Sequence, residues 1–356
     1  MTTATSALTT PGQIAANLPG ILGFYPHDSL VLVTFTSTSP TDCYSLGPVL
    51  RIDLDDLRML PELAQVVEDI DPDMVFGFLV TTRPEEEINE IIDALVHMSH
   101  IGMLDLDLAW VVGEILTGEP VTIGYGSPRL LADLDPAWSR DVVAPVSGAR
   151  AMEPLLAQGT LPDLTREEAQ EHFQHGTPHH DADGCEQLTS FALGRARDLS
   201  PMDYPALAAD LRLLIDEARD VPLDDLLAEE DVLLTAATLL GTLELRDLII
   251  EDVLRAPETG GQLMLAVART FTGVIRHNAL CIHALCMVRL QLTMRTTHAL
   301  LAALEEDPTH MLSRLLIAPA QCGKFEFMLA SVREGSRIVR AQHGVEDPPR
   351  KWGWAG

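Results

Sequence analysis

Short unbroken runs of hydrophobic residues alternate with amphipathic segments over the first 145 residues of the chain. Runs of this kind, bounded by glycine, proline and aspartate, are typical of strands that are buried on both faces of a sheet. The pattern predicts five strands, at 30–35, 47–54, 73–82, 106–115 and 120–125.

Segments with a 3.6-residue hydrophobic period lie between these runs, at 57–68 and 85–100. A further helix is predicted before the first strand, because Thr10 can cap a helix whose first residue is Pro11. Helices that alternate with buried strands indicate an α/β domain. We therefore expect a buried sheet flanked by helices over residues 1–145.

Beyond residue 150 the hydrophobic positions recur only at helical spacing, as in "YPALAADLRLLIDEA" and "LDDLLAEEDVLLTAATLLGTL". This pattern predicts an all-α domain over 150–335. The connections between its helices are short, which favours antiparallel neighbours.

The end of the chain, 336–356, contains Pro348 and Pro349 and finishes in "KWGWAG". We predict a flexible tail here, because terminal segments with no core to enter are poorly ordered. Arg337 and Arg340 belong to it, and arginine and tryptophan are enriched in binding hot spots. Two alternatives stay open: a partner-binding peptide, and a flap that folds back on the acidic helices.

One stretch near the N-terminus, "LPGILGFYPHDSLVLV" at 18–33, combines two glycines, two prolines and a His-Asp-Ser triplet directly before an apolar run, as a family signature does. It resembles the N-terminal pattern P-x-L-L-G-F-x-P-x-D-S-L-V of an uncharacterised family from high-GC Gram-positive bacteria, known only as a domain of unknown function. The resemblance extends to 239–250 and 298–316, and so over roughly residues 9 to 335. It implies the two-part architecture and no assigned activity. The matching residues are Pro19, Leu22, Gly23, Phe24, Pro26, Asp28, Ser29, Leu30 and Val31.

The net charge and the low number of lysines exclude several classes of function. The chain has 24 Lys and Arg against 53 Asp and Glu, a net charge of −29 that opposes a phosphate backbone. We therefore expect no nucleic-acid binding. Only Lys324 and Lys351 are lysines, and Phe325 follows Lys324 where a Walker A loop needs Ser or Thr. Schiff-base and kinase-type chemistry also need a suitably placed lysine, and we exclude both.

The five cysteines are scattered and form no C-x-x-C pair, which predicts reduced thiols rather than a disulfide framework or a zinc ribbon. No hydrophobic run is long enough to span a bilayer. The opening "MTTATSALTTPG" lacks the basic and apolar regions of a secretory signal, so we expect a cytoplasmic protein.

A weak anion-binding candidate follows the fifth strand, at Gly124, Gly126, Ser127 and Arg129. A turn of this composition before a helix presents backbone N–H groups to an anion, although the third glycine of a dinucleotide loop is missing. Asp28 is the other ligand-binding candidate, as a cleft residue. Its neighbours complete a His-Asp-Ser triplet, but consecutive side chains diverge and cannot form a catalytic triad. A turn leading into the strand is the simpler interpretation.

Histidine and cysteine clusters give the only candidate metal ligands. The set His172, His175, His179 and Cys185 lies within 14 residues but matches no closed zinc spacing, so we predict no metal and no cofactor. Cys281, His283 and Cys286 lie in an apolar helix and are interpreted as core residues.

The sequence thus favours a non-catalytic cytosolic interaction protein whose helical half binds a protein partner. The alternative is an enzyme or sensor that binds a small anionic ligand near Gly124–Arg129, and a metal-dependent protein using 172–185 is the third hypothesis. The catalytic residues, if any exist, and the oligomeric state stay open.

Overall fold

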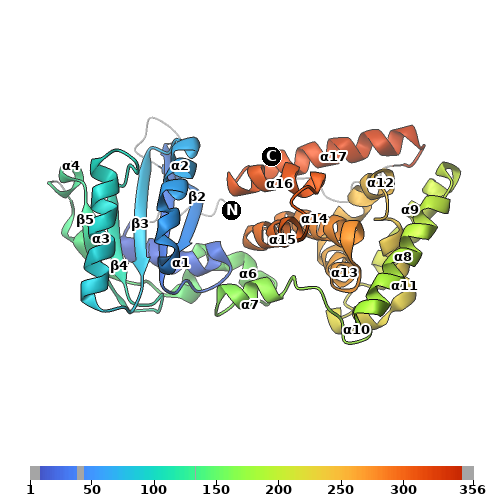
Figure 1. The fold of residues 1–356 in the computed structure, drawn as a ribbon, viewed down its shortest axis with the longest axis horizontal. Helices are drawn as coiled ribbons and strands as arrows, with labels where there is room; N and C mark the ends of the chain where they lie inside the picture. The colour runs from blue at the N-terminus through green and yellow to red at the C-terminus, as the bar shows by residue number, and fades with distance from the viewer. Residues whose placement is uncertain (1–8, 38–43, 133, 347–356) are drawn as a thin grey trace, which may run out of the picture. The chain divides into compact units, whose positions relative to one another are not determined.

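The computed structural model describes residues 9–37, 44–132 and 134–346, with side chains throughout except at 128 and 129. The chain forms two compact units, Met1–Glu168 and Ala169–Gly356. The first contains a sheet with flanking helices and the second a group of helices, which confirms the predicted fold class (Figure 1).

The sheet of the first unit has six strands in the order β2-β1-β3-β4-β5-β6. Strands β3 and β4 are parallel, and every other neighbouring pair is antiparallel. The five predicted strands are all present. The sixth, β6, is a three-residue edge strand too short to have a hydrophobic pattern. The bounds are β1 Ser29–Ser37, β2 Tyr44–Asp53, β3 Met74–Val80, β4 Leu108–Val112, β5 Pro120–Gly126 and β6 Arg140–Val142.

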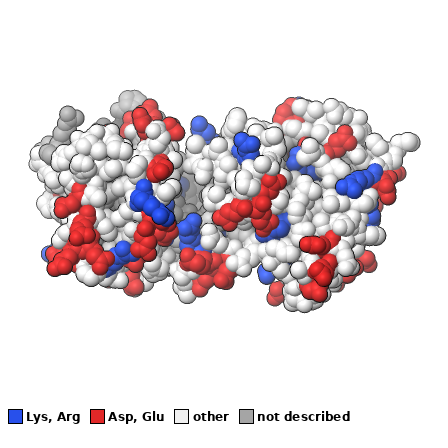
Figure 2. All heavy atoms as spheres, in the orientation of Figure 1, with Lys and Arg blue, Asp and Glu red and all other residues white. Residues whose placement is uncertain are grey.

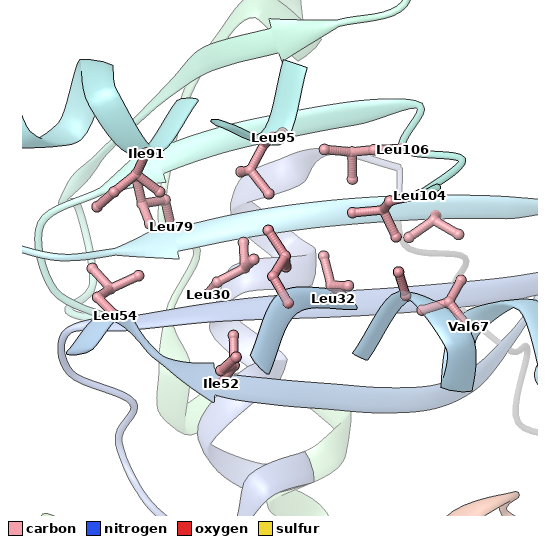
Figure 3. Packing of buried hydrophobic residues seen from close by; sticks show 14 residues of the cluster. Leu30, Leu32, Ile52, Leu54, Val67, Leu79, Ile91, Leu95, Leu104 and Leu106 are labelled. Carbon is pink, nitrogen blue, oxygen red and sulfur yellow. The ribbon is translucent and has the colours of Figure 1, made fainter. Parts of the chain in front are cut away.

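Helices cover both faces of this sheet. On one face, α2 (Leu60–Ile70) and α3 (Glu85–His100) pack over a cluster of buried aliphatic side chains that includes Leu30, Leu32 and Leu79 (Figure 3). On the other face lies α1 (Pro11–Leu22), whose Thr10 cap accepts a hydrogen bond from the Gln13 N–H. Because successive strand residues point to opposite faces, both faces of β1 are apolar and both are buried.

The first unit extends about twenty residues beyond the predicted boundary at 145–150. The added segment contains η2 Val146–Gly148, η3 Arg150–Met152 and α6 Glu153–Ala157, and the division falls within α7 (Arg166–Glu171). The segment is bound to α1 and to the signature stretch through polar backbone contacts. The Ala151 N–H donates to Asn17 Oδ1 at 2.9 Å, and the Tyr25 N–H donates to the Asp163 carbonyl at 3.0 Å. The buried apolar residues of this segment recur every three positions through short helical turns, and this spacing differs from the 3.6-residue period of a long helix: they are Val146, Ala149, Met152 and Leu155.

In the second unit the described residues form helices and contain no strand, as predicted. Helix α14 is its centre, because every residue from Ile275 to Val288 is buried. The elements are α8 Ala182–Asp198, η4 Pro201–Asp203, α9 Tyr204–Glu217, α10 Leu223–Ala228, α11 Glu230–Thr238, α12 Leu243–Leu254, α13 Pro257–Thr270, α14 Gly273–Arg289, α15 Thr293–Glu306, α16 Met311–Gln321 and α17 Phe325–Gln342.

The prediction of a tail from residue 336 is wrong over its first part, because α17 continues to Gln342. Ser336 donates to the Asp247 carbonyl at 2.5 Å. The Arg340 side chain is 1% exposed and forms a 2.6 Å ion pair with Asp252 of α12, which is itself fully buried. Packing against α12 therefore orders this segment. The remainder of the predicted tail, 347–356, lies outside the described residues.

No helix in the described ranges is long and apolar enough to cross a membrane.

Candidate functional site

The signature stretch forms a polar corner at one end of the sheet. Asp28 precedes β1 with a φ of 38°, a left-handed conformation that aspartate tolerates better than most residues. The register pairs Ser29 with Val80, which brings Asp28 beside the residues that follow β3. Thr81 Oγ1 donates to Asp28 Oδ1 at 2.5 Å, and Arg83 Nε lies 3.4 Å from Asp28 Oδ2.

A second set of contacts connects the same corner to β2 and to α7. Arg51 Nε donates to Ser29 Oγ at 2.8 Å, and its guanidinium carbon lies 5.4 Å from the centre of the Phe24 ring. Arg51 also pairs with Asp53, whose carboxylate accepts from Arg166 at 3.1 Å. The side chains of Asp28 and Ser29 in the signature stretch are therefore satisfied by residues of β2 and of the segment after β3.

These contacts support the interpretation of the His-Asp-Ser triplet as a turn. Ser29 Oγ donates to the backbone carbonyl of His27 at 2.5 Å, while the His27 side chain is exposed. Among the described residues, no imidazole forms a hydrogen bond with Ser29 Oγ, as a catalytic triad requires. Asp28 and Ser29 are held by bonds to the Thr81 side chain and to the His27 carbonyl.

Within the segment Gly124–Arg129, the two glycines allow close packing against the sheet. Gly124 and Gly126 lie within β5, and a Cβ on them would come 2.9 Å from Ile92 Cδ1 and 2.6 Å from Leu131 Cδ2. Ser127 occupies the N-cap position of α4, a single helical turn (Pro128–Leu131), but its side chain makes no capping hydrogen bond. Arg129 lies in this turn, and its side chain is outside the described part of the structure.

Asp28 is not brought together with that segment. Gly126 pairs with Leu108 at the start of β4, whereas Val80, the neighbour of Asp28, pairs with Val112 at its end. The two candidate positions therefore lie at opposite ends of the sheet.

The histidine segment is dispersed over different surroundings. Cys185 is buried in α8, at 1% exposure, and the His172 ring packs edge-on against Phe173 with centroids 5.1 Å apart. Burial lowers the pKa of His172 to about 3, and it also lowers the pKa of His175. His179 is exposed. Among the described residues, no group of three or more His, Cys, Asp or Glu side chains is arranged to hold a metal ion.

A buried polar network, which the sequence did not indicate, joins α14 to the N-terminus of α16. Cys281 Sγ lies 3.1 Å from Ser313 Oγ, which lies 2.7 Å from His310 Nδ1. His310 Nε2 lies 3.2 Å from Asn278 Oδ1. A consistent assignment has the thiol donating to the hydroxyl, the hydroxyl to Nδ1, and Nε2–H to the amide oxygen.

Thiol, imidazole and amide are the groups of a cysteine protease, but their surroundings here oppose that chemistry. Burial raises the pKa of Cys281 to about 12 and lowers the pKa of His310 to about 4. The attacking species in such enzymes is the thiolate, which these pKa values disfavour. Pairs spaced three apart, Asn278 with Cys281 and His310 with Ser313, were the available signal in the sequence.

Helix α16 also has an exposed apolar face. Met311 is 62% exposed and Leu315 is 63% exposed, and exposed Ala318 follows at the same helical spacing. We call Met311, Leu315 and Ala318 the α16 stripe. On the opposite side, Leu312 and Leu316 are buried, so α16 has apolar residues on both faces.

Comparison with known proteins identifies a family but no relative of established function. Residues 11–323 match the model of the family described as "Domain of unknown function (DUF4192)". This range includes the polar corner and all of α16. No curated protein and no solved structure matches the chain.

Proposed function

The chain belongs to the DUF4192 family, and we propose that it is a non-catalytic cytosolic interaction protein whose helical unit binds a protein partner through the α16 stripe. The observation that carries this proposal is the exposure of Met311 and Leu315 one helical turn apart. Large apolar side chains at i and i+4, followed by a small one at i+7, form the contact face of helices that dock against a groove or another helix.

The stripe is large enough to matter for affinity. Burying one exposed Met or Leu side chain contributes about 1.5–3 kcal/mol. Two such residues therefore supply about 3–6 kcal/mol, which corresponds to a factor of roughly 10²–10⁴ in affinity. A partner that covers the stripe gains this in addition to its other contacts.

The chemistry-bearing groups described above support a binding rather than a catalytic role. The polar corner consists of ion pairs and hydrogen bonds whose members satisfy one another, with carboxylates and arginines in near balance. The buried thiol of Cys281 is fully enclosed. The overall charge disfavours a nucleic-acid partner, so the proposal names a protein (Figure 2).

The test is a single charge placed on the stripe. Leu315→Glu should abolish the association of the protein with its partner in cells of its own source, read out by native mass spectrometry of the purified complex. Phe191→Glu is the matched control, because Phe191 is 57% exposed on α8 and lies outside the stripe. Equal partner recovery with both variants, at unchanged circular dichroism, would refute the proposal.

A further inference from the structure

Two unpaired cations accompany the α16 stripe. Over α15–α17, Arg314 and Lys324 are the described Lys and Arg residues with no side-chain partner, and both are exposed. The other arginines of these helices are engaged, for example Arg333 with Glu251 and Arg337 with Glu334. Two cations without a partner on, or directly after, the helix that carries the stripe favour a partner with carboxylates at the matching positions.

Their positions relate directly to the stripe. At 100° per residue, Arg314 projects from α16 about 60° from Met311 and about 40° from Ala318, so it borders the stripe on one side. Lys324 follows the C-terminal end of α16 and precedes α17. Helix α16 ends at Gln321 and Gly323 has a φ of 66°, so the chain changes direction between Arg314 and Lys324.

Nearby carboxylates balance these cations only in part. Glu326 lies in the first turn of α17, where it offsets the positive end of that helix. Glu305 is exposed at the end of α15. Neither pairs with Arg314 or Lys324.

From this arrangement we propose that the partner segment is an acidic amphipathic helix, with apolar residues against the α16 stripe and carboxylates opposite Arg314 and, beyond the end of α16, Lys324. This inference rests on the proposed function, which it makes more specific. It also runs against the net charge of −29, because that charge as a whole favours a basic partner. The unpaired cations near the stripe therefore predict an acidic partner, whereas the net charge of the whole chain predicts a basic one.

Two synthetic 16-residue helical peptides separate the predictions. Both carry leucine at i, i+4 and i+7, and they differ only in having glutamate or lysine at the flanking positions. Their binding to the full-length protein is measured by fluorescence anisotropy at about 50 mM and 500 mM salt, where charge screening differs strongly. One exposed charge pair changes affinity by roughly 1.5- to 5-fold, and exchanging the peptides turns two attractions into two repulsions. We expect the acidic peptide to bind about tenfold tighter at low salt, with a smaller ratio at high salt.

Substitutions in the protein test whether Arg314 and Lys324 cause the preference for the acidic peptide. Arg314→Ser with Lys324→Ser should remove the preference for the acidic peptide. Arg195→Ser with Arg197→Ser is the control with the same charge change, because these are exposed α8 arginines outside the stripe. This control should retain the preference. Leu315→Glu should remove the binding of both peptides.

The outcomes distinguish the two proposals. Equal or tighter binding of the basic peptide, still sensitive to Leu315→Glu, would overturn the acidic partner and leave the docking face in place. If neither peptide shows binding that depends on Leu315, the inference fails together with the surface on which the proposed function rests.

Discussion

Replacing Arg340 by methionine should strongly destabilise the helical unit. The change removes the cation paired with Asp252 at 2.6 Å and the hydrogen bonds from Arg340 to the carbonyls of Leu248 and Glu346. Asp252 is fully buried, and burial raises its pKa, which is the direction expected for a carboxylate that is poorly solvated. Removing one partner of a buried ion pair costs about 3–5 kcal/mol, because the other charge stays uncompensated.

The lower end of that range applies here. Arg212 Nε still lies 2.8 Å from Asp252 Oδ1, although the two atoms are not oriented for a hydrogen bond. A loss of about 3 kcal/mol lowers the melting temperature by about 6–12 °C in a unit of this size. Arg337→Met is the matched control on the same helix. Its i,i+3 pair with Glu334 is exposed on both sides, so solvent screens it and its loss should change stability little.

Thermal unfolding followed by circular dichroism at pH 7 measures both variants. A shift for Arg340→Met no larger than that for Arg337→Met would refute the assignment of Arg340 as a buried anchor. The double variant Arg340→Met with Asp252→Asn tests the cause, because it removes the stranded anion. It should be no less stable than Arg340→Met alone.

Three further outcomes are expected. Burial lowers the pKa values of His283 and His310 to about 4. The free energy of unfolding should therefore be full above pH 6.5 and should fall as the pH drops from 6.5 towards 4, by about 2 kcal/mol for each histidine at pH 5. Urea titrations that give equal stability at pH 7 and pH 5 would contradict this. Elemental analysis of native protein should find no stoichiometric zinc, and one zinc per chain lost on His172→Ala with His175→Ala would contradict that expectation. A gel-shift assay with random duplex DNA at physiological salt should show no sub-micromolar binding, because the net charge of −29 opposes it.

Local hydrophobic patterns in the sequence were sufficient to predict the strands β1 to β5 of the sheet and the helix α3. The strands around β1, β3 and β4 are continuous apolar runs, and α3 occupies the predicted range 85–100. A buried strand and an amphipathic helix each leave a repeating pattern within their own residues, so they can be read without knowledge of their neighbours. The segment at 146–168 has no pattern of that length, because it consists of short helical turns that are joined to α1 and the signature stretch by polar contacts.

Contacts between distant residues account for what the sequence did not indicate. Arg337 and Arg340 look alike in the sequence, yet one is 62% exposed and the other is buried against a carboxylate 88 residues away. Cys281 and Ser313 are 32 residues apart and meet only because α14 and α16 pack together. The α16 stripe could have been suspected from apolar residues on all sides of 311–320, but only burial shows which face is free.

The buried network and the exposed stripe belong to the same helix, and this connects stability to the proposed function. His310 caps α16, because Nδ1 accepts from the Ser313 N–H, and its other ring nitrogen is bound to Asn278 of α14. Neutral imidazole is required for this role, since a protonated Nδ1 cannot accept. The network therefore anchors the start of α16, the helix that carries Met311 and Leu315, to the most buried helix of the unit. A rigid docking face loses less conformational entropy on binding than a mobile one, which favours affinity without additional contacts.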